Sequence, residues 1–378
     1  MARVLHLFNV LGAPTEATWL ELAMRLSALG HEIVIAYETL AGGARLPDLR
    51  CVRVPRIAVE PSDDIPAQMT DIATQTTIPG AGEFDLVHGH LGTRILHAST
   101  FLAHGTPTIL SLYGYDTGRL LRDPCWVRRY RWAAEHGATF VVLCRAMADT
   151  LHQHGIPDEA VRVIPLGIDL RKWVYDPQPV PSPPRFVFVG RLVPKKCPDI
   201  LIDAFRIIAD DTAATLDIVG NGPMRAQIEE QISRHGLTGR IHLHDELPRD
   251  KVADLLRGAA ALVLSSAEAP DGDREGTPIV LMEAQALGTP CITTDHSGNP
   301  DVLPPESRSF IVPQRDADAL ARAMTHMLRL GGDPRRAIQD AGRAWITKHF
   351  DLDQTVQRYD ALYSECLCRA RAAHSPAS

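Results

Sequence analysis

Residues 265–290 read SSAEAPDGDREGTPIVLMEAQALGTP, and this stretch decides the fold of the second half of the chain. The apolar run 259–264 before it predicts a buried strand. A polar loop follows, and then Pro278 stands where the first position of a helix tolerates a missing N–H. Gly288 and Pro290 end that helix. A helix that starts after a strand and a carboxylate-bearing loop can bind phosphate oxygens through its free N–H groups.

Length and composition describe a globular protein. The 378 residues exceed one ordinary hydrophobic core, so we expect two domains. A net charge of −7 without a long basic block argues against nucleic-acid binding. Seven scattered cysteines, and no apolar run long enough to span a membrane, favour a cytoplasmic protein with reduced thiols. We interpret the apolar residues 4–11 as a first strand rather than a signal-peptide core, because a helical pattern follows them.

The N-terminal part alternates strand and helix patterns, which is typical of a parallel α/β sheet. A strand is expected over residues 4–8, an amphipathic helix over 19–29 and a second strand over 32–37. The loop after the first strand, which holds Gly12 and Glu16, lies at the carboxyl edge where such sheets bind ligands. Further on, repeated prolines between residues 40 and 83 predict short strands and a mobile loop.

Two further groups of polar residues in this part have competing interpretations. His88 and His90 alternate at the end of a predicted strand, so their rings point the same way. No third metal ligand is in reach by sequence, and we interpret them as hydrogen-bonded or acceptor-facing groups. Residues 119–131 predict either a basic, aromatic surface that contacts an anionic membrane or lipid-linked acceptor, or a solvated face over core aromatics. The basic residues of that segment are Arg119, Arg122, Arg128, Arg129 and Arg131.

The run DPQPVPSPP at 176–184 marks the clearest boundary, because so much proline makes a stiff, extended connector. A strand pattern restarts directly after it. We therefore predict an N-terminal domain over 1–175, a linker over 176–184, a second domain over 185–350 and a C-terminal helix over 351–378.

Three motifs of the second domain carry a resemblance to a known family. The domain opens with GRLVPKK at 190–196, a GNGP turn follows at 220–223, and Glu275 and Glu283 are separated by seven residues in the opening stretch. Together they resemble the GT4 family of retaining glycosyltransferases, especially members that build bacterial polysaccharides. The run PTEAT at 14–18 approximates a further family motif loosely. Asp271-x-Asp273, a metal-binding pattern in another glycosyltransferase fold, is interpreted here as part of a polar loop.

The resemblance implies the GT-B fold, with two Rossmann-like domains whose parallel sheets face a cleft and a C-terminal helix that returns to the first domain. It implies a nucleoside diphosphate sugar donor, by preference a UDP-sugar, held by the second domain. The first domain would hold a sugar-containing or lipid-linked acceptor. A hexosyl group would be transferred to an acceptor hydroxyl with retention of configuration, without a metal or other cofactor. The implied location is the cytoplasm, with peripheral contact at the inner membrane face through residues 119–131.

The resemblance also assigns roles to individual residues. Arg191 and Lys196 would neutralise the departing diphosphate, where fixed cations stabilise the growing negative charge. Glu275 would hold sugar hydroxyls. The amides of Ile279 and Val280 would bind the distal phosphate, and Glu283 the ribose diol. The other implied donor contacts are Gly12, Gly190, Gly222, His244, Gly276 and Thr277. The implied acceptor or sugar-proximal residues are Glu16, His88, His90, Tyr113 and Asp116.

Two positions depart from the family pattern. Tyr113 stands where relatives carry a histidine near the reacting carbon, and a phenol with a pKa of about 10 is a poor base at neutral pH. It can still donate or accept a hydrogen bond. Asp245 stands where glycine is usual, so the nucleotide base is not specified. Two other classes stay open: a nucleotide-sugar epimerase of the same fold, which needs no acceptor, and a partner protein that binds the donor without turnover.

Overall fold

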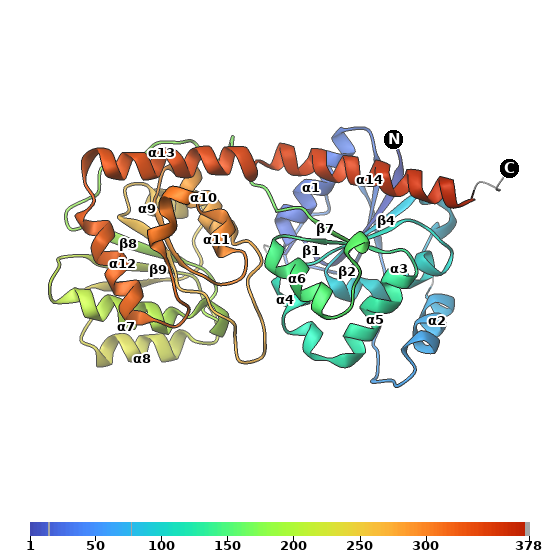
Figure 1. The fold of residues 1–378 in the computed structure, drawn as a ribbon, viewed down its shortest axis with the longest axis horizontal. Coiled ribbons are helices and arrows are strands. Elements are labelled where there is room, and N and C mark those ends of the chain that lie inside the picture. The colour runs from blue at the N-terminus through green and yellow to red at the C-terminus, as the bar shows by residue number, and fades with distance from the viewer. Residues whose placement is uncertain (14–15, 77, 375–378) are drawn as a thin grey trace. The chain divides into compact units, whose positions relative to one another are not determined.

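The computed structural model describes residues 1–13, 16–76 and 78–374 (Figure 1). Contacts divide the chain into two compact units. Unit 1 comprises Met1–Leu166 and Leu352–Ser378, and unit 2 comprises Gly167–Asp351. Each unit is built on one parallel sheet, which confirms the prediction of two Rossmann-like α/β domains.

Unit 1 contains a seven-stranded sheet in the order β3-β2-β1-β4-β5-β6-β7, and all neighbouring strands are parallel. The order reverses between β1 and β4, so ligands are expected at the carboxyl ends of these two strands. The strands are β1 (Arg3–Leu11), β2 (Glu32–Leu40), β3 (Arg50–Arg53), β4 (Leu86–His90), β5 (Thr108–Ser111), β6 (Thr139–Val142) and β7 (Val161–Val163).

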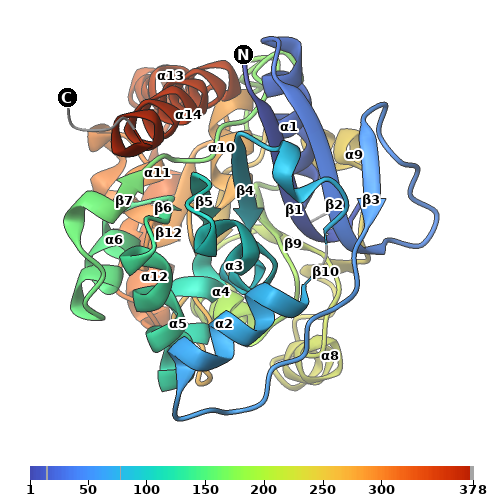
Figure 2. The same ribbon diagram turned by 90° about the vertical axis from the view of Figure 1, so that its right-hand side faces the viewer.

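The helices of unit 1 cover both faces of this sheet. They are α1 (Ala17–Ala28), α2 (Ile65–Gln75), α3 (Ile95–Ala103), α4 (Gly114–Thr117), α5 (Pro124–Glu135), α6 (Arg145–Gln153) and α14 (Leu352–His374). Helices α2, α3 and α5 pack against one another (Figure 2). The C-terminal helix α14 contacts α1, which confirms that the chain returns to its first domain.

The prediction for residues 40–83 was partly wrong, because this segment contains α2. Its N-cap is Asp64, whose side chain accepts a hydrogen bond from the Ala67 N–H at 3.0 Å. Pro66 lies in the first turn, where no helical N–H partner is needed. Pro66, one of the prolines from which short strands and a loop are expected, therefore helps to begin a helix.

Unit 2 contains a six-stranded parallel sheet in the order β10-β9-β8-β11-β12-β13. Its strands are β8 (Arg185–Val189), β9 (Thr215–Val219), β10 (Ile241–His244), β11 (Ala261–Leu264), β12 (Cys291–Thr294) and β13 (Ile311–Val312). Its helices are α7 (Pro198–Ala209), α8 (Arg225–Arg234), α9 (Arg249–Leu256), α10 (Ile279–Leu287), α11 (Asn299–Val302), α12 (Ala317–Arg329) and α13 (Gly332–His349). The core includes Trp173, so residues that precede the proline-rich run pack within unit 2.

Candidate donor site and the polar core of unit 1

The strand order of unit 2 reverses between β8 and β11, so the loops after these strands diverge and leave space for a ligand. The loop after β8 contains Arg191 and Lys196, and the loop after β11 contains Glu275. Lys196 and Glu275, which are 79 positions apart in the sequence, are thus brought to the same point of the sheet edge. Arg191 is exposed, whereas Glu275 is buried.

Lys196 and Glu275 form the central ion pair of this edge. The Lys196 Nζ lies 2.8 Å from the Glu275 Oε1, which also accepts a hydrogen bond from the Ser266 hydroxyl at 3.2 Å. Burial alone would raise the pKa of Glu275, but the charges of Lys196 and Lys195 outweigh it and lower the pKa to about 2. Glu275 is therefore a carboxylate at every physiological pH, and its second oxygen can still accept a hydrogen bond from a ligand hydroxyl.

The loop between β11 and α10 is braced by a second lysine. The Lys195 Nζ lies 3.0 Å from Asp273 and donates a hydrogen bond to the Arg274 carbonyl at 3.0 Å. Asp271 accepts a hydrogen bond from the Asp273 N–H at 3.1 Å. These contacts agree with the interpretation of the two aspartates as part of a polar loop.

His296 is a part of the site to which the sequence assigned no role. Its Nε2 accepts a hydrogen bond from the Glu275 N–H at 3.1 Å, and its Nδ1 lies 3.0 Å from the Gln314 Oε1. The Ser297 hydroxyl donates to the Glu275 carbonyl at 2.8 Å. The loop after β12 therefore fixes the backbone of Glu275. The position of this loop at the carboxyl edge was predictable from the sequence, but the hydrogen bonds that His296 and Ser297 make to Glu275 were not.

Helix α10 begins at Ile279 with Pro278 as its N-cap, one residue later than predicted. The amides of Ile279 and Val280 lie in the first turn, where an α-helix offers no carbonyl partner. The neighbouring Thr277 hydroxyl is buried and has no hydrogen-bond partner among the described residues. Unpaired buried polar atoms are costly, so this hydroxyl and the helix start together indicate a site for a polar ligand.

Glu283 lies on α10, one to two turns beyond the helix start. Burial raises its pKa to about 7, and the opposing charge of Arg249, 3.9 Å away, only partly offsets this. His244, at the end of β10, is held at 2.6 Å by Asp217. The structure thus places both predicted donor contacts in unit 2 and leaves their roles as predictions.

Gly222 lets the loops after β8 and β9 cross closely. The Leu192 N–H donates to the Asn221 carbonyl at 2.9 Å, and the Met224 N–H donates to the Leu192 carbonyl at 3.0 Å. A Cβ atom at Gly222 would lie 2.5 Å from the Leu192 carbonyl oxygen. Only glycine can therefore keep the Arg191 loop in place by this contact.

Gly222→Ala is expected to lower the free energy of unfolding by about 1–3 kcal/mol. It should also lower turnover, because the loop that carries Arg191 and Lys196 must shift. Urea unfolding followed by circular dichroism measures the first effect. Gly239→Ala is the matched control, since a Cβ atom there meets nothing within 4 Å. Equal stability of the two variants would contradict the prediction.

The predicted acceptor-side residues of unit 1 lie near one sheet edge. Asp116 is buried, and its carboxylate accepts hydrogen bonds from the Gly92 N–H at 2.9 Å and the Tyr113 N–H at 2.8 Å. It thereby joins the loops that follow β4 and β5. The Tyr113 ring stacks on Trp19, with ring centroids 4.2 Å apart. These contacts orient Tyr113 and indicate that Asp116 positions it.

Glu16 follows β1 and is buried, with one oxygen accepting the Val10 N–H at 3.0 Å. Its other oxygen is buried without a hydrogen-bond partner among the described residues, and burial raises its pKa to about 7. Gly12 adopts a positive φ of 84° directly after β1. Pro14 and Thr15, part of the loose family motif, lie outside the described residues.

His88 and His90 are fully buried, and the expectation that no third ring is in reach was wrong. His6 on β1 pairs with His88 in the strand register, and ligand atoms of the three rings lie within 4.8 Å of one another. Each of the six ring nitrogens already has a hydrogen-bond partner. The interpretation as hydrogen-bonded groups therefore fits this cluster.

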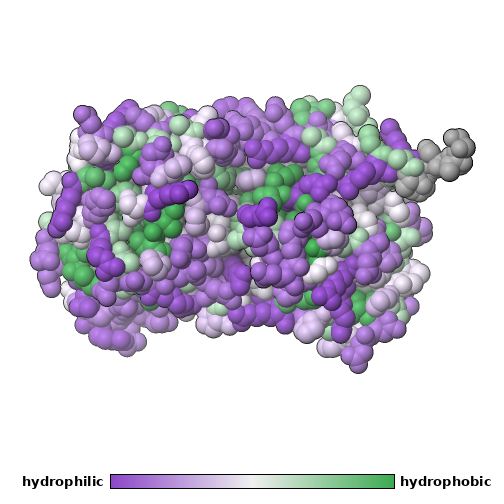
Figure 3. Space-filling model, viewed as in Figure 1, coloured by the Kyte–Doolittle hydropathy of each residue, from purple (hydrophilic) through white to green (hydrophobic). Residues whose placement is uncertain are grey.

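Three arginines of the segment 119–131 are engaged within unit 1. Arg128 donates to the Ser62 carbonyl at 2.9 Å, Arg129 to the Gln68 side chain at 2.6 Å, and Arg131 to the His154 carbonyl at 2.8 Å. The neighbouring Tyr130 and Trp132 are buried, as the alternative of a solvated face over core aromatics expects, although Arg129 itself is buried too. On the face shown in Figure 3, apolar residues occur in small groups among hydrophilic ones. Among the described residues, no helix combines the length and apolar character needed to cross a bilayer.

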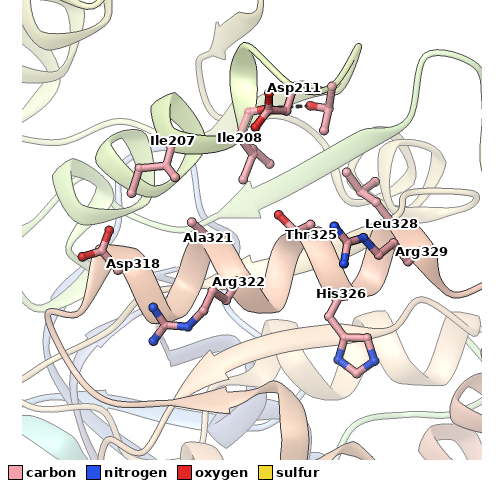
Figure 4. Close-up of a pocket in the computed structure, with 11 residues that line it drawn as sticks. Ile207, Ile208, Asp211, Asp318, Ala321, Arg322, Thr325, His326, Leu328 and Arg329 are labelled. Carbon is pink, nitrogen blue, oxygen red and sulfur yellow. Dashed lines mark hydrogen bonds between the residues drawn. The ribbon is translucent and has the colours of Figure 1, made fainter.

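A separate hollow of about 770 Å³ lies between α7 and α12 (Figure 4). Its lining mixes apolar and charged side chains, including Ile208, Asp211 and Arg322. Asp211 and Thr212 follow the C-terminal end of α7 and precede β9, so the hollow lies away from the carboxyl edge of the sheet. None of the predicted donor or acceptor residues lines it.

Solved structures show the same fold over nearly the whole chain. HepE from Anabaena, solved with UDP-glucose, superimposes with a TM-score of 0.74 at 16% identity, over 97% of this chain and 100% of that one. Sucrose-phosphate synthase from Thermosynechococcus elongatus gives a TM-score of 0.74 at 18% identity, over 97% and 100% of the two chains. The fold is therefore GT-B, as predicted.

Family models identify the family to which the chain belongs, whereas the solved structures show only its fold. Residues 15–172 match the model for Glycosyltransferase Family 4, and residues 173–345 match that for glycosyl transferases group 1. The two matches together cover residues 15–345, and the chain belongs to the GT4-type glycosyltransferases.

Curated relatives are similar over part of their length. AmsK of Erwinia amylovora, an amylovoran biosynthesis glycosyltransferase, is 31% identical over 199 residues, which cover 52% of this chain and 49% of AmsK. WcaL of Salmonella typhimurium, named for colanic acid biosynthesis, is 29% identical over 231 residues, 61% of this chain and 57% of WcaL. The chain thus spans about half the length of these relatives.

Proposed function

We propose that this protein is a retaining glycosyltransferase that moves a hexosyl group from a UDP-sugar to an acceptor hydroxyl. The acceptor would be a growing polysaccharide, a lipid-linked sugar or a glycosylated natural product. The observation that carries this proposal is the Lys196–Glu275 pair, 2.8 Å apart at the reversal point of the unit 2 sheet, beside the start of α10. The names of AmsK and WcaL, which refer to polysaccharide assembly, favour the first of these acceptors.

The proposed chemistry needs positive charge around a departing diphosphate. Lys196, the exposed Arg191 and the first-turn amides of α10 would stabilise the leaving oxygens. Glu275 would accept hydrogen bonds from sugar hydroxyls through the oxygen that faces away from Lys196. The acceptor oxygen bonds to the anomeric carbon as the bond from that carbon to the diphosphate breaks. The acceptor's proton passes to a leaving phosphate oxygen.

A screen of nucleotide sugars tests this proposal. We expect one UDP-sugar to raise the melting temperature, because a ligand bound only by the folded state stabilises it. The same donor, labelled in the sugar and incubated with glycan acceptors, should give a glycoside with the donor's anomeric configuration by NMR. An isomerised donor without an acceptor would identify an epimerase instead. Binding without any product on long incubation would identify a non-catalytic partner protein.

A further inference from the structure

Seven buried or half-buried polar groups of unit 1 form one continuous series of hydrogen bonds, which we call the Tyr359–Tyr113 network. Its members come from β1, β4, β5, the loop after β5, and α14. In order, the distances are Tyr359 Oη to Ser111 Oγ 2.8 Å, Ser111 Oγ to His88 Nε2 2.7 Å, His88 Nδ1 to Tyr363 Oη 2.6 Å, Tyr363 Oη to His6 Nε2 3.1 Å, His6 Nδ1 to His90 Nε2 3.0 Å, and His90 Nδ1 to Tyr113 Oη 3.2 Å.

The members of this network constrain one another's hydrogens. Burial lowers the pKa of His6 to about 3 and places those of His88 and His90 well below the ordinary value, so all three rings are neutral. A neutral imidazole donates through one nitrogen and accepts through the other, and a hydroxyl has one hydrogen. If every bond of the series holds one hydrogen, all hydrogens point either toward Tyr113 or toward Tyr359.

The Tyr359 end decides between these two directions. Tyr359 is buried on α14, and its hydroxyl bonds to Ser111. If Tyr359 accepted that bond, its own hydrogen would need another acceptor in the interior. Among the described residues, its hydrogen-bond partner is Ser111, and no second acceptor is offered. An unpaired buried donor is costly, whereas an unused oxygen lone pair is tolerated more often. Tyr359 therefore donates, and every hydrogen in the network points toward Tyr113.

We propose that the Tyr359–Tyr113 network holds the Tyr113 hydroxyl as a hydrogen-bond donor to a carbohydrate oxygen, with His6, His88 and His90 all in the Nδ1–H tautomer. The Tyr113 oxygen accepts from His90, so its own hydrogen is left for a ligand. Stacking on Trp19 fixes the ring that carries it. Burial raises the pKa of Tyr113 well above its usual value, so the phenol stays neutral. The carbohydrate part of this inference rests on the proposed function, whereas the direction of the hydrogens does not.

Histidine ¹⁵N NMR of the full-length protein without ligands tests the direction. We expect three imidazoles with a protonated Nδ1 and an unprotonated Nε2, assigned through couplings within each ring, that do not titrate between pH 6 and pH 8. An Nε2–H tautomer at any of these three residues would overturn the proposal. Shifts of these nitrogens on addition of Zn²⁺ would also overturn it, because they would identify a metal site.

Two variants test the role of the network in turnover. Tyr359→Phe should leave the three tautomers and kcat unchanged, because Ser111 then becomes the end of the series and, among the described residues, can place its hydrogen only on His88. Tyr113→Phe removes both the donor to the ligand and the acceptor of the His90 hydrogen, so one buried donor is unpaired in either direction, the histidines should show mixed tautomers and kcat should fall about tenfold. Tyr37→Phe, on β2 and outside the network, is the control for the loss of a phenol. Wild-type kcat in Tyr113→Phe, or an Nε2–H tautomer in Tyr359→Phe, would overturn the proposal. An inactive wild-type protein with the expected tautomers would instead contradict the proposed function.

Discussion

Arg191→Ala is expected to lower kcat/KM for glycosyl transfer by about 10²–10³-fold, the usual effect of removing one fixed group that stabilises transition-state charge. The residue directly follows Gly190 at the end of β8, where the strand order of unit 2 reverses. Its side chain is exposed, so the variant should keep the melting temperature of the parent. The loss should lie mainly in kcat, because the charge on the diphosphate grows as the bond to the sugar breaks.

The matched control is Arg234→Ala. Arg234 is exposed on α8 of the same unit, and its ion-pair partner within the described ranges is its helix neighbour Glu230, at 2.8 Å. Steady-state kinetics of both variants with the UDP-sugar found in the screen give the comparison. Near-normal kinetics of Arg191→Ala would reject the proposed diphosphate site. A melting temperature well below that of the control would show that Arg191 supports the fold instead.

The placement of Lys196 and Glu275 at one edge of the unit 2 sheet was largely predictable from sequence, because the segments that carry them are local. Each functional loop directly follows an apolar strand, and parallel strands bring their carboxyl ends to one edge. The pattern of a strand, a carboxylate loop and a helix start therefore placed Glu275 near α10, and the run after β8 placed Lys196 at the same edge. What the pattern could not give is the 2.8 Å contact between them, which depends on the neighbouring positions of β8 and β11.

The polar core of unit 1 was not predictable in the same way. His6 and His88 are 82 residues apart, and only the register of β1 against β4 makes them partners. Tyr359 and Tyr363 stand one helical turn apart on α14, so a shared face was visible, but not that this face meets His88. For the basic segment 119–131, the sequence suggested an exposed surface where the structure shows contacts within unit 1. The arginines of this segment look like a surface in the sequence, yet Arg129 and Arg131 bind groups of their own unit that only the fold brings near.

Glu275→Gln is expected to lower kcat by more than about 10²-fold and to change how stability depends on pH. Glutamine keeps the size of the side chain but cannot carry the charge that pairs with Lys196 and Lys195. In the folded protein the pKa of Glu275 is lowered from 4.5 to about 2. A depressed pKa contributes stability above the unfolded value, and this contribution is lost as the pH falls toward the folded value. The parent should therefore lose stability between pH 4.5 and pH 2 that the variant never had.

Urea unfolding at pH 7 and at steps below pH 5 measures this difference, and Glu229→Gln is the matched control. Glu229 is half exposed on α8 and pairs with Arg225 at 2.9 Å, where solvent screens the charge. The free energy of unfolding of Glu275→Gln should lie below that of the parent at pH 7, and the two values should converge as the pH falls. Parallel pH profiles would mean that Glu275 is not held as a carboxylate by its lysines. Since the same charge would grip the sugar hydroxyls, parallel profiles together with normal turnover would remove the basis for the donor site.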